Sequence, residues 1–261
     1  MSQAISVLVA LVSLRIHPTG LSVSLHDLRP HRNIMGQILK IGIPIALQDG
    51  FIQVAFMIIT IIANQRGLND AAAVGIVEKI ISFLFLIPSS MLSTVSALGA
   101  QNIGAGKRQR ANETLRYAVL ITVGFGIIVG IFMQFFASTV VALFTDTSDA
   151  QGAEVVRLGG QYLRGYVWDC MFAGIHFSFS GYFCACGKSG ISFLHNIIAI
   201  TLVRIPGVYL ASTLFPDTLF PMGLATAAGS LLSAIICVVA FTILNRKENE
   251  KRLILANKNT S

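Results

Sequence analysis

Long apolar runs are the feature that most constrains the fold of this chain. Each is at least as long as the roughly 20 residues that an α-helix needs to cross the hydrocarbon layer of a bilayer. Transmembrane barrel strands have only about 10 residues and alternate between apolar and polar side chains. The sequence therefore predicts an all-α, polytopic membrane bundle with six full transmembrane helices. The runs cover residues 36–63, 71–100, 115–136, 162–186, 191–215 and 222–244.

The composition supports a membrane protein over a soluble one. The chain has 261 residues, of which 54% are hydrophobic and 12% charged, and its mean hydropathy is +0.73. Soluble domains carry about 25% charged residues, so this chain has too little polar surface for a water-soluble globule. Its net charge of +7 comes from short connectors and not from a basic face with interleaved aromatics. We therefore expect the lipid bilayer, and no nucleic acid, as a partner.

The N-terminal residues differ from the rest of the chain. Residues 1–14 are apolar but span only about 21 Å as a helix, which is too short to cross a bilayer. We interpret them as the remnant of a preceding transmembrane helix, followed by a polar cytoplasmic linker at 15–35. The six-helix bundle is expected at 36–245 and a cytoplasmic C-terminal tail at 246–261.

The distribution of basic residues predicts the orientation in the membrane. If the helices alternate in direction, fourteen of the 19 Lys and Arg residues fall on one side. Cytoplasmic connectors carry such an excess, so this side is predicted to face the cytoplasm. The protein is expected in the inner (plasma) membrane of the cell. The C-terminus is then cytoplasmic. The residues are Arg15, Arg29, Arg32, Lys40, Lys107, Arg108, Arg110, Arg116, Lys188, Arg246, Lys247, Lys251, Arg252 and Lys258.

The connector between the third and fourth runs leaves one question open. Its segment Thr139–Phe144 fits a short interfacial helix on the outer side and equally fits a continuation of the third helix.

The first full helix carries a polar stripe. Steps of 3.6 residues from Asp49 place Gln53, Met57, Thr60 and Asn64 on the same face. Charged residues within spanning helices are costly and usually face a bundle interior or a water-filled cavity. Asp49, Gln53 and Met57 are therefore candidates for lining a substrate or ion cavity.

A second stripe runs along the fourth run from Asp169 through Phe172 and His176. An acid, aromatics and a histidine would suit an organic cation or a proton relay. The alternative, which we favour, is structural: Asp169 pairs with a neighbouring helix and His176 is an interior histidine with its hydrogen bonds satisfied. Arg204 in the fifth run reaches a similar depth from the opposite end. An unpaired arginine at that depth costs several kcal/mol, so we predict a buried Arg204–Asp169 pair.

Other polar features predict little chemistry. Glu78 and Lys79 lie near the end of the second run and are expected to extend to the membrane interface. Four cysteines lie within apolar runs and have no metal or redox spacing. No catalytic or nucleotide-binding motif and no metal-ligand cluster is present, so no catalytic or metal residues and no enzyme activity are expected.

Several segments, in order, resemble the multidrug and toxic compound extrusion (MATE) transporters. The resemblance covers nearly the whole chain and corresponds to the second half of the family. It is carried by Gly42–Gln48, Ser96–Lys107, Gly181–Lys188, Val203–Pro206 and Gly223–Ala227.

The resemblance implies a secondary active antiporter that exports drugs and organic cations in exchange for H⁺ or Na⁺, with no other cofactor. This chain would be its C-terminal lobe, working with a separate N-terminal half or as a homodimer. The second-half acids of sodium-coupled members would fall at Ile52 and Ala173. Here Asp49 and Asp169 lie about one turn away.

Three alternatives remain at this point. A lipid-linked oligosaccharide flippase of the same superfamily would need several basic residues in its cavity, and only Arg204 is central. A polytopic membrane enzyme lacks its catalytic set, and a truncated, non-functional fragment is the third possibility. The candidate cavity residues are Asp49, Gln53, Met57, Asp169, Phe172, His176 and Arg204.

Overall fold

The computed structural model describes residues 5, 7, 9, 12, 13, 31–147 and 149–258, with the backbone alone at 247–249 and 251–258. This part of the chain is helical and contains no strand, which confirms the predicted all-α membrane bundle. Most of the predicted remnant at 1–14 and of the linker at 15–35 lies outside the described residues. The helices are α2 (Arg32–Arg66), α3 (Leu68–Leu84), α4 (Leu86–Gly104), α5 (Arg108–Ala142), α6 (Ala150–Tyr166), α7 (Asp169–Ala185), α8 (Ser189–Ala199), α9 (Ile205–Leu214) and α10 (Phe220–Lys258).

The chain divides into two compact units, Met1–Leu39 and Lys40–Ser261. In the first unit, the described residues are helical at 5, 7, 9, 12 and 13 and again from Arg32, where α2 begins. The second unit contains the helical bundle and all the side chains discussed below.

The six predicted runs correspond to helices or to helix pairs in the described residues. Five of these segments are long and apolar enough to cross a membrane: 32–66, 68–104, 108–142, 189–214 and 220–246. The fourth run appears as α6 and α7, of 17 residues each, which are separated by a turn at Val167 and Trp168.

Two further spans are broken near a proline. Pro88 has no N–H and cannot donate a hydrogen bond to the carbonyl of Leu84. Helix α3 ends at Leu84. In the fifth span, a widened π-helical turn at Ile200–Arg204 separates α8 from α9, just before Pro206. Such single π turns inside helices are frequent at functional positions. Both breaks lie next to residues of the candidate site.

The connector between the third and fourth predicted runs, at 137–161, is mostly helical. Helix α5 continues to Ala142, so the alternative of a continued third helix is the right one for most of Thr139–Phe144. Helix α6 begins at Ala150, where the side chain of Asp149 accepts a hydrogen bond of 2.6 Å from the backbone of Gly152. This N-cap explains why the next helix starts well before residue 162.

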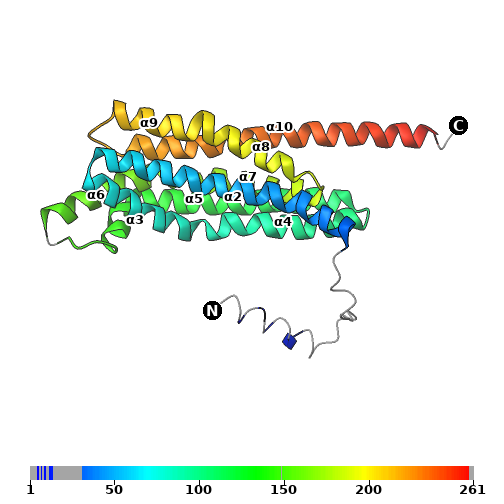
Figure 1. Ribbon diagram of the computed structural model, residues 1–261, viewed down its shortest axis with the longest axis horizontal. Coiled ribbons are helices and arrows are strands. Elements are labelled where there is room, and N and C mark those ends of the chain that lie inside the picture. The colour runs from blue at the N-terminus through cyan, green and yellow to red at the C-terminus, as the bar shows by residue number, and fades with distance from the viewer. Residues whose placement is uncertain are drawn as a thin grey trace. The chain divides into compact units, whose positions relative to one another are not determined.

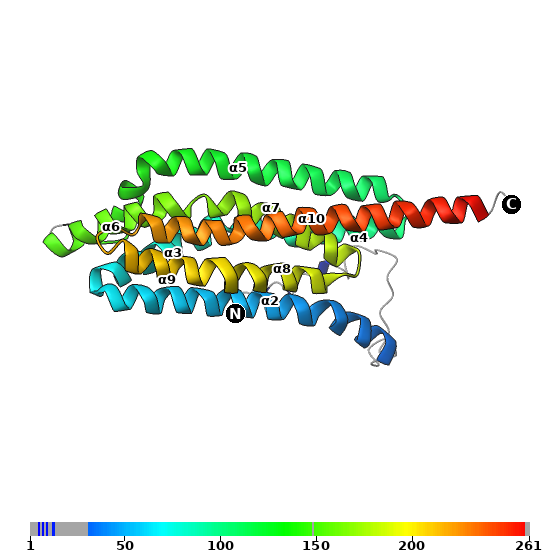
Figure 2. The ribbon, with the colours of Figure 1, turned by 90° about the horizontal axis from the view of Figure 1, so that it is seen from above.

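Small residues allow the central helices to approach closely. A methyl group at Gly174 of α7 would lie 2.5 Å from the Cβ of Thr122 on α5, and one at Gly126 would lie equally close to Met171. Membrane helices associate through such small-residue contacts because apolar burial gives no advantage against lipid. Figure 1 shows the helices running along a common direction, and in Figure 2 α7 lies between α5 on one edge and α2 on the other.

Arg66 holds the C-terminal end of α2 in place. Its guanidinium donates to the backbone carbonyls of Ser212, Phe215 and Pro216 at 2.9, 3.1 and 2.6 Å, and it pairs with Asp70 at 3.0 Å. These carbonyls lie at the end of α9 and in the connector to α10, where helix carbonyls otherwise lack partners. The turn between α2 and α3 is thereby tied to α9.

Candidate functional site

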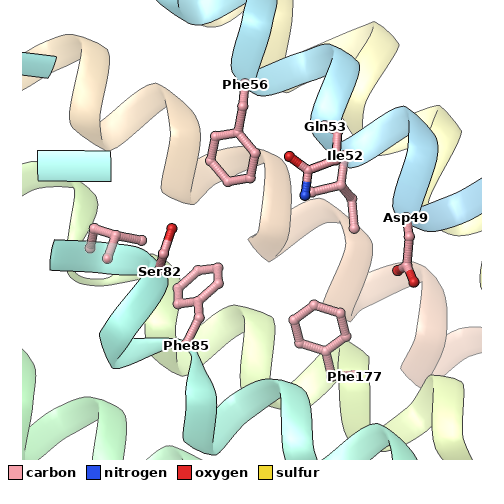
Figure 3. A pocket seen from close by; sticks show the side chains of 8 residues that line it. Asp49, Ile52, Gln53, Phe56, Ser82, Phe85 and Phe177 are labelled. Carbon is pink, nitrogen blue, oxygen red and sulfur yellow. The ribbon is translucent and has the colours of Figure 1, made fainter. Parts of the chain in front are cut away.

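A cavity of about 310 Å³ lies between α2, α3 and α7. Figure 3 shows Asp49 and Gln53 on α2 on one side of this space, with Ser82 and Phe85 from the α3–α4 segment and Phe177 of α7 across from them. The structure therefore brings an acid, an amide and several aromatic rings together. The lining residues are Asp49, Ile52, Gln53, Phe56, Ile81, Ser82, Phe85 and Phe177.

The local sequence explains why these side chains meet. Asp49 and Gln53 are four residues apart on α2, as are Ile52 and Phe56, so both pairs fall on neighbouring positions of one helix face. Phe85 sits at the break between α3 and α4 that Pro88 produces. The break near Pro88 thus places an aromatic ring in the cavity that Asp49 of α2 also lines.

Asp49 has no partner within the described residues. It is exposed on α2, and neither an ion pair nor a hydrogen bond to it is found in this part of the chain. An unpaired carboxylate beside aromatic rings can attract a cation through its charge and through cation–π contacts. The cavity therefore has the chemistry of a site for a cation with an apolar body.

Asp169 and Arg204 form the predicted buried pair. The Nη2 of Arg204 lies 3.3 Å from the Oδ2 of Asp169 and donates a 2.9 Å hydrogen bond to the hydroxyl of Tyr166. Asp169 is fully buried and Arg204 is 6% exposed. The pair connects α7 to the π turn before α9, and removing either partner would leave a buried charge uncompensated.

Arg204 also connects this pair to the cavity. Its guanidinium carbon lies 5.2 Å from the ring centroid of Phe56, which lines the cavity from α2. The buried pair therefore supports one aromatic wall of the site without belonging to its lining.

The expectation that Glu78 extends to the membrane interface is wrong. It is only partly exposed and lies 3.3 Å from the hydroxyl of Thr60, on the polar stripe of α2. The helix face of Glu78 packs toward α2, whereas its neighbour Lys79 is exposed, as a residue about 100° around the helix should be. The stripe on α2 thus continues beyond the cavity to an acid that the sequence pattern had placed elsewhere.

The other predicted residues lie outside the cavity lining. Met57 is 65% exposed and Phe172 is half-buried. His176 is buried, and its ring centroid lies 4.6 Å from that of Phe177, so it packs behind the cavity wall. Of the seven candidates, the structure brings Asp49 and Gln53 together at the cavity and Asp169 and Arg204 together in the interior.

A serine–histidine cluster behind the cavity was missed by the sequence analysis. His195 of α8 lies 3.0 Å from the hydroxyl of Ser180 on α7 and 2.6 Å from that of Ser233 on α10. Its ring centroid is 5.7 Å from that of His176. These contacts join three helices. Ser180 lies one turn after His176, on the stripe that begins at Asp169, but α8 and α10 contribute one residue each, His195 and Ser233, and one residue gives no periodic signal.

The comparison with protein families identifies the fold. A family model described as MatE matches residues 44–210. The chain belongs to the MatE family. Members of this family are transporters, so the expectation that the chain is not an enzyme is confirmed. The match includes both the cavity and the Asp169–Arg204 pair.

Relatives of this MatE chain include three bacterial proteins. The probable multidrug resistance protein YpnP of Bacillus subtilis is 27% identical over 67% of this chain and 38% of its own length. YoeA of the same organism is 20% identical over 95% of this chain and 53% of its length. NorM of Aromatoleum aromaticum is 30% identical over 44% of this chain and 25% of its length. The chain therefore spans at most about half the length of these curated relatives.

Solved structures show the same fold. A MATE transporter in the straight conformation has a TM-score of 0.79 at 19% identity, covering 92% of this chain and 54% of its own. The Vibrio cholerae transporter VcmN in the bent form has a TM-score of 0.76 at 17% identity, covering 95% and 54%. A MOP superfamily transporter from Pyrococcus furiosus, reported with reverse polarity of its binding pocket, has a TM-score of 0.78 at 19% identity, covering 85% and 49%. The likeness fits a partial, C-terminal half of the MatE fold.

Proposed function

We propose that this chain is the second lobe of a multidrug efflux transporter that exports organic cations in exchange for H⁺ or Na⁺. The observation that carries the proposal is the cavity that Phe56, Phe85 and Phe177 line together with Asp49, which has no partner among the described residues. A carboxylate beside aromatic rings favours a ligand that combines a positive charge with a flat apolar body. The relatives described as multidrug resistance proteins support this class of substrate.

One lobe supplies one wall of the site in this proposal. The cavity is open on the α2 side, where Asp49 and Gln53 are exposed. A separate N-terminal half, or a second copy of this chain, would close it. The basic connectors would face the cytoplasm, so that the protein spans the plasma membrane with its C-terminus inside.

The cavity chemistry favours a cation over a pyrophosphate-linked lipid. Its lining contains one acid and no Lys, Arg or His. Arg204 is already engaged by Asp169 and Tyr166. A flippase for a lipid-linked oligosaccharide would need basic side chains where this cavity has Asp49.

Binding of ethidium to the purified chain tests this proposal. Asp49→Asn removes the charge with little change in shape, and we expect it to weaken binding about tenfold, the equivalent of about 1.4 kcal/mol. Asp217→Asn, at an exposed acid in the α9–α10 connector, is the matched control and should bind as the unmodified chain does. Equal binding by the Asp49→Asn variant would exclude Asp49 from the site.

Transport assays in cells test whether this lobe needs a second half to export a substrate. The chain expressed alone should not export ethidium from cells, whereas co-expression with a MatE-family first half should restore efflux that depends on a Na⁺ or H⁺ gradient. Efflux by the single chain would show that copies of this lobe assemble into a transporter.

A further inference from the structure

A second, different groove lies between α5, α7 and α10. It has a volume of about 460 Å³, and its lining is polar at one end and apolar along the rest. The polar end is formed by Asn112, Arg116 and Asn245. The apolar walls are Leu115, Val119, Leu120, Phe179 and Phe241. Figure 2 shows α5 and α10 running toward the same end of the bundle, where the α4–α5 turn lies.

The polar and apolar parts are ordered along the helix axis. Arg116 lies eight residues after the start of α5 at Arg108, or about 12 Å along the helix. Val119 and Leu120 follow in the next turn, farther from the basic connector. A ligand in this groove would therefore place its charged group near the connector and its apolar part toward the middle of the membrane.

Aromatic packing gives the groove a built wall. The ring of Phe241 lies edge-on to Tyr182 at 5.2 Å and to Phe179 at 5.5 Å. The hydroxyl of Tyr182 also donates a 2.6 Å hydrogen bond to the side-chain Oδ1 of Asn112, which leaves the side-chain NH₂ group of Asn112 as a donor. The groove is thus lined by side chains that contacts within the lobe already hold in place.

Arg116 is the unused charge at this groove. It is exposed and forms no ion pair or hydrogen bond with any residue that the structure describes. Glu113, the nearest acid along α5, accepts a hydrogen bond from Gln109 and lines a separate hollow with Lys107 and Arg110. A guanidinium and two carboxamides above an apolar channel are complementary to a phosphate with an attached acyl chain.

We propose that the α5–α7–α10 groove binds an anionic glycerophospholipid, with the phosphate at Arg116 and one acyl chain along Val119, Leu120 and Phe241. Basic pockets between transmembrane helices on the cytoplasmic side are known to hold acidic lipid headgroups. The apolar walls select a lipid over a free phosphate ion, because a phosphate alone would leave them uncovered. This proposal does not depend on the transport function.

Native mass spectrometry of the purified chain tests it, with phosphatidylglycerol and phosphatidylcholine supplied in equal amounts. We expect phosphatidylglycerol to remain bound in preference. Arg116→Gln should weaken its binding about fivefold, since one basic residue near a membrane surface contributes about 1 kcal/mol, and should leave phosphatidylcholine binding unchanged. Arg110→Gln, at an exposed basic residue outside the groove, is the matched control. Val119→Trp fills the groove and should weaken the binding of both lipids.

Three results would overturn the proposal. The first is unchanged phosphatidylglycerol binding in the Arg116→Gln variant. The second is an equal loss in the Arg110→Gln control, which would indicate diffuse surface charge instead of a groove. The third is displacement of the lipid by millimolar inorganic phosphate, which would indicate an anion site without a role for the apolar walls. A thermal melt of each variant confirms that it is folded.

Discussion

Two acids in apolar helices of this lobe have opposite surroundings. Asp169 is fully buried and paired with Arg204, on a helix that buries twelve of its 17 residues. Asp49 is exposed to a cavity and unpaired within the described residues, on a helix that buries five of 35. A charge within a spanning helix therefore shows that protein or water lines that helix, but its partner decides whether the charge holds the structure or meets a ligand.

The buried Asp169–Arg204 pair and the cavity at Asp49 are connected through Arg204. Arg204 contacts Asp169 and Tyr166 in the interior and lies over the ring of Phe56 at the cavity wall. Damage to the interior pair should therefore alter the cavity, whereas neutralising Asp49 should leave the interior unchanged. The stability of variants in detergent distinguishes the structural acid from the exposed one.

The largest effect is expected from Arg204→Met. It removes one partner of a buried pair and leaves the carboxylate of Asp169 uncompensated, which should cost about 3 kcal/mol. The free energy of unfolding, measured by denaturant titration in detergent, checks this. Arg204→Met combined with Asp169→Leu should recover much of the loss, because no buried charge remains.

A double-mutant cycle on Arg204 and Asp169 can contradict this prediction. If the effects of Arg204→Met and Asp169→Leu simply add, the two side chains do not interact, and the interior pair is not what stabilises α7.

A smaller loss is expected from Gly174→Ala on α7. The new methyl group would lie 2.5 Å from the Cβ of Thr122, so α5 and α7 must separate, at a cost of about 1–3 kcal/mol. Gly50→Ala on α2 is the matched control, because nothing lies within 4 Å of its methyl position. We expect this control to be neutral or stabilising by up to about 1 kcal/mol, since alanine favours the helix.

Equal losses in the two alanine variants would contradict the contrast between a packed α7 and a loosely covered α2. The melting temperatures of the two variants, measured side by side, decide this.

The sequence predicted the fold class and the interior pair for clear physical reasons. A membrane can be spanned only by α-helices or closed β-barrels, so the length of the apolar runs was enough to predict helices. The Arg204–Asp169 pair followed from depth, because a charge at that level must find a partner. Each inference needed only the chain itself and the thickness of a bilayer.

The cavity could be predicted only in part, because its lining depends on how helices rotate and break. Asp49 and Gln53 were found from the period of α2, but Phe177 lies on a different face of α7 from the Asp169 stripe, and Phe85 enters through a break in the second span. Glu78 was placed at the interface because helix periodicity does not show which helix lies opposite. Its contact with Thr60 comes from packing between α2 and α3.

The smallest effect on stability is expected from Asp49→Asn. Because the carboxylate is exposed and has no partner within the described residues, neutralising it should change the free energy of unfolding by less than about 0.5 kcal/mol. Ethidium binding should nevertheless fall in the same preparation, which separates a ligand-binding acid from a structural one. Unfolding and ethidium titrations on one sample measure both quantities. A loss of stability comparable to that of Arg204→Met would mean that Asp49 also holds the structure, and the contrast between the two acids would no longer stand.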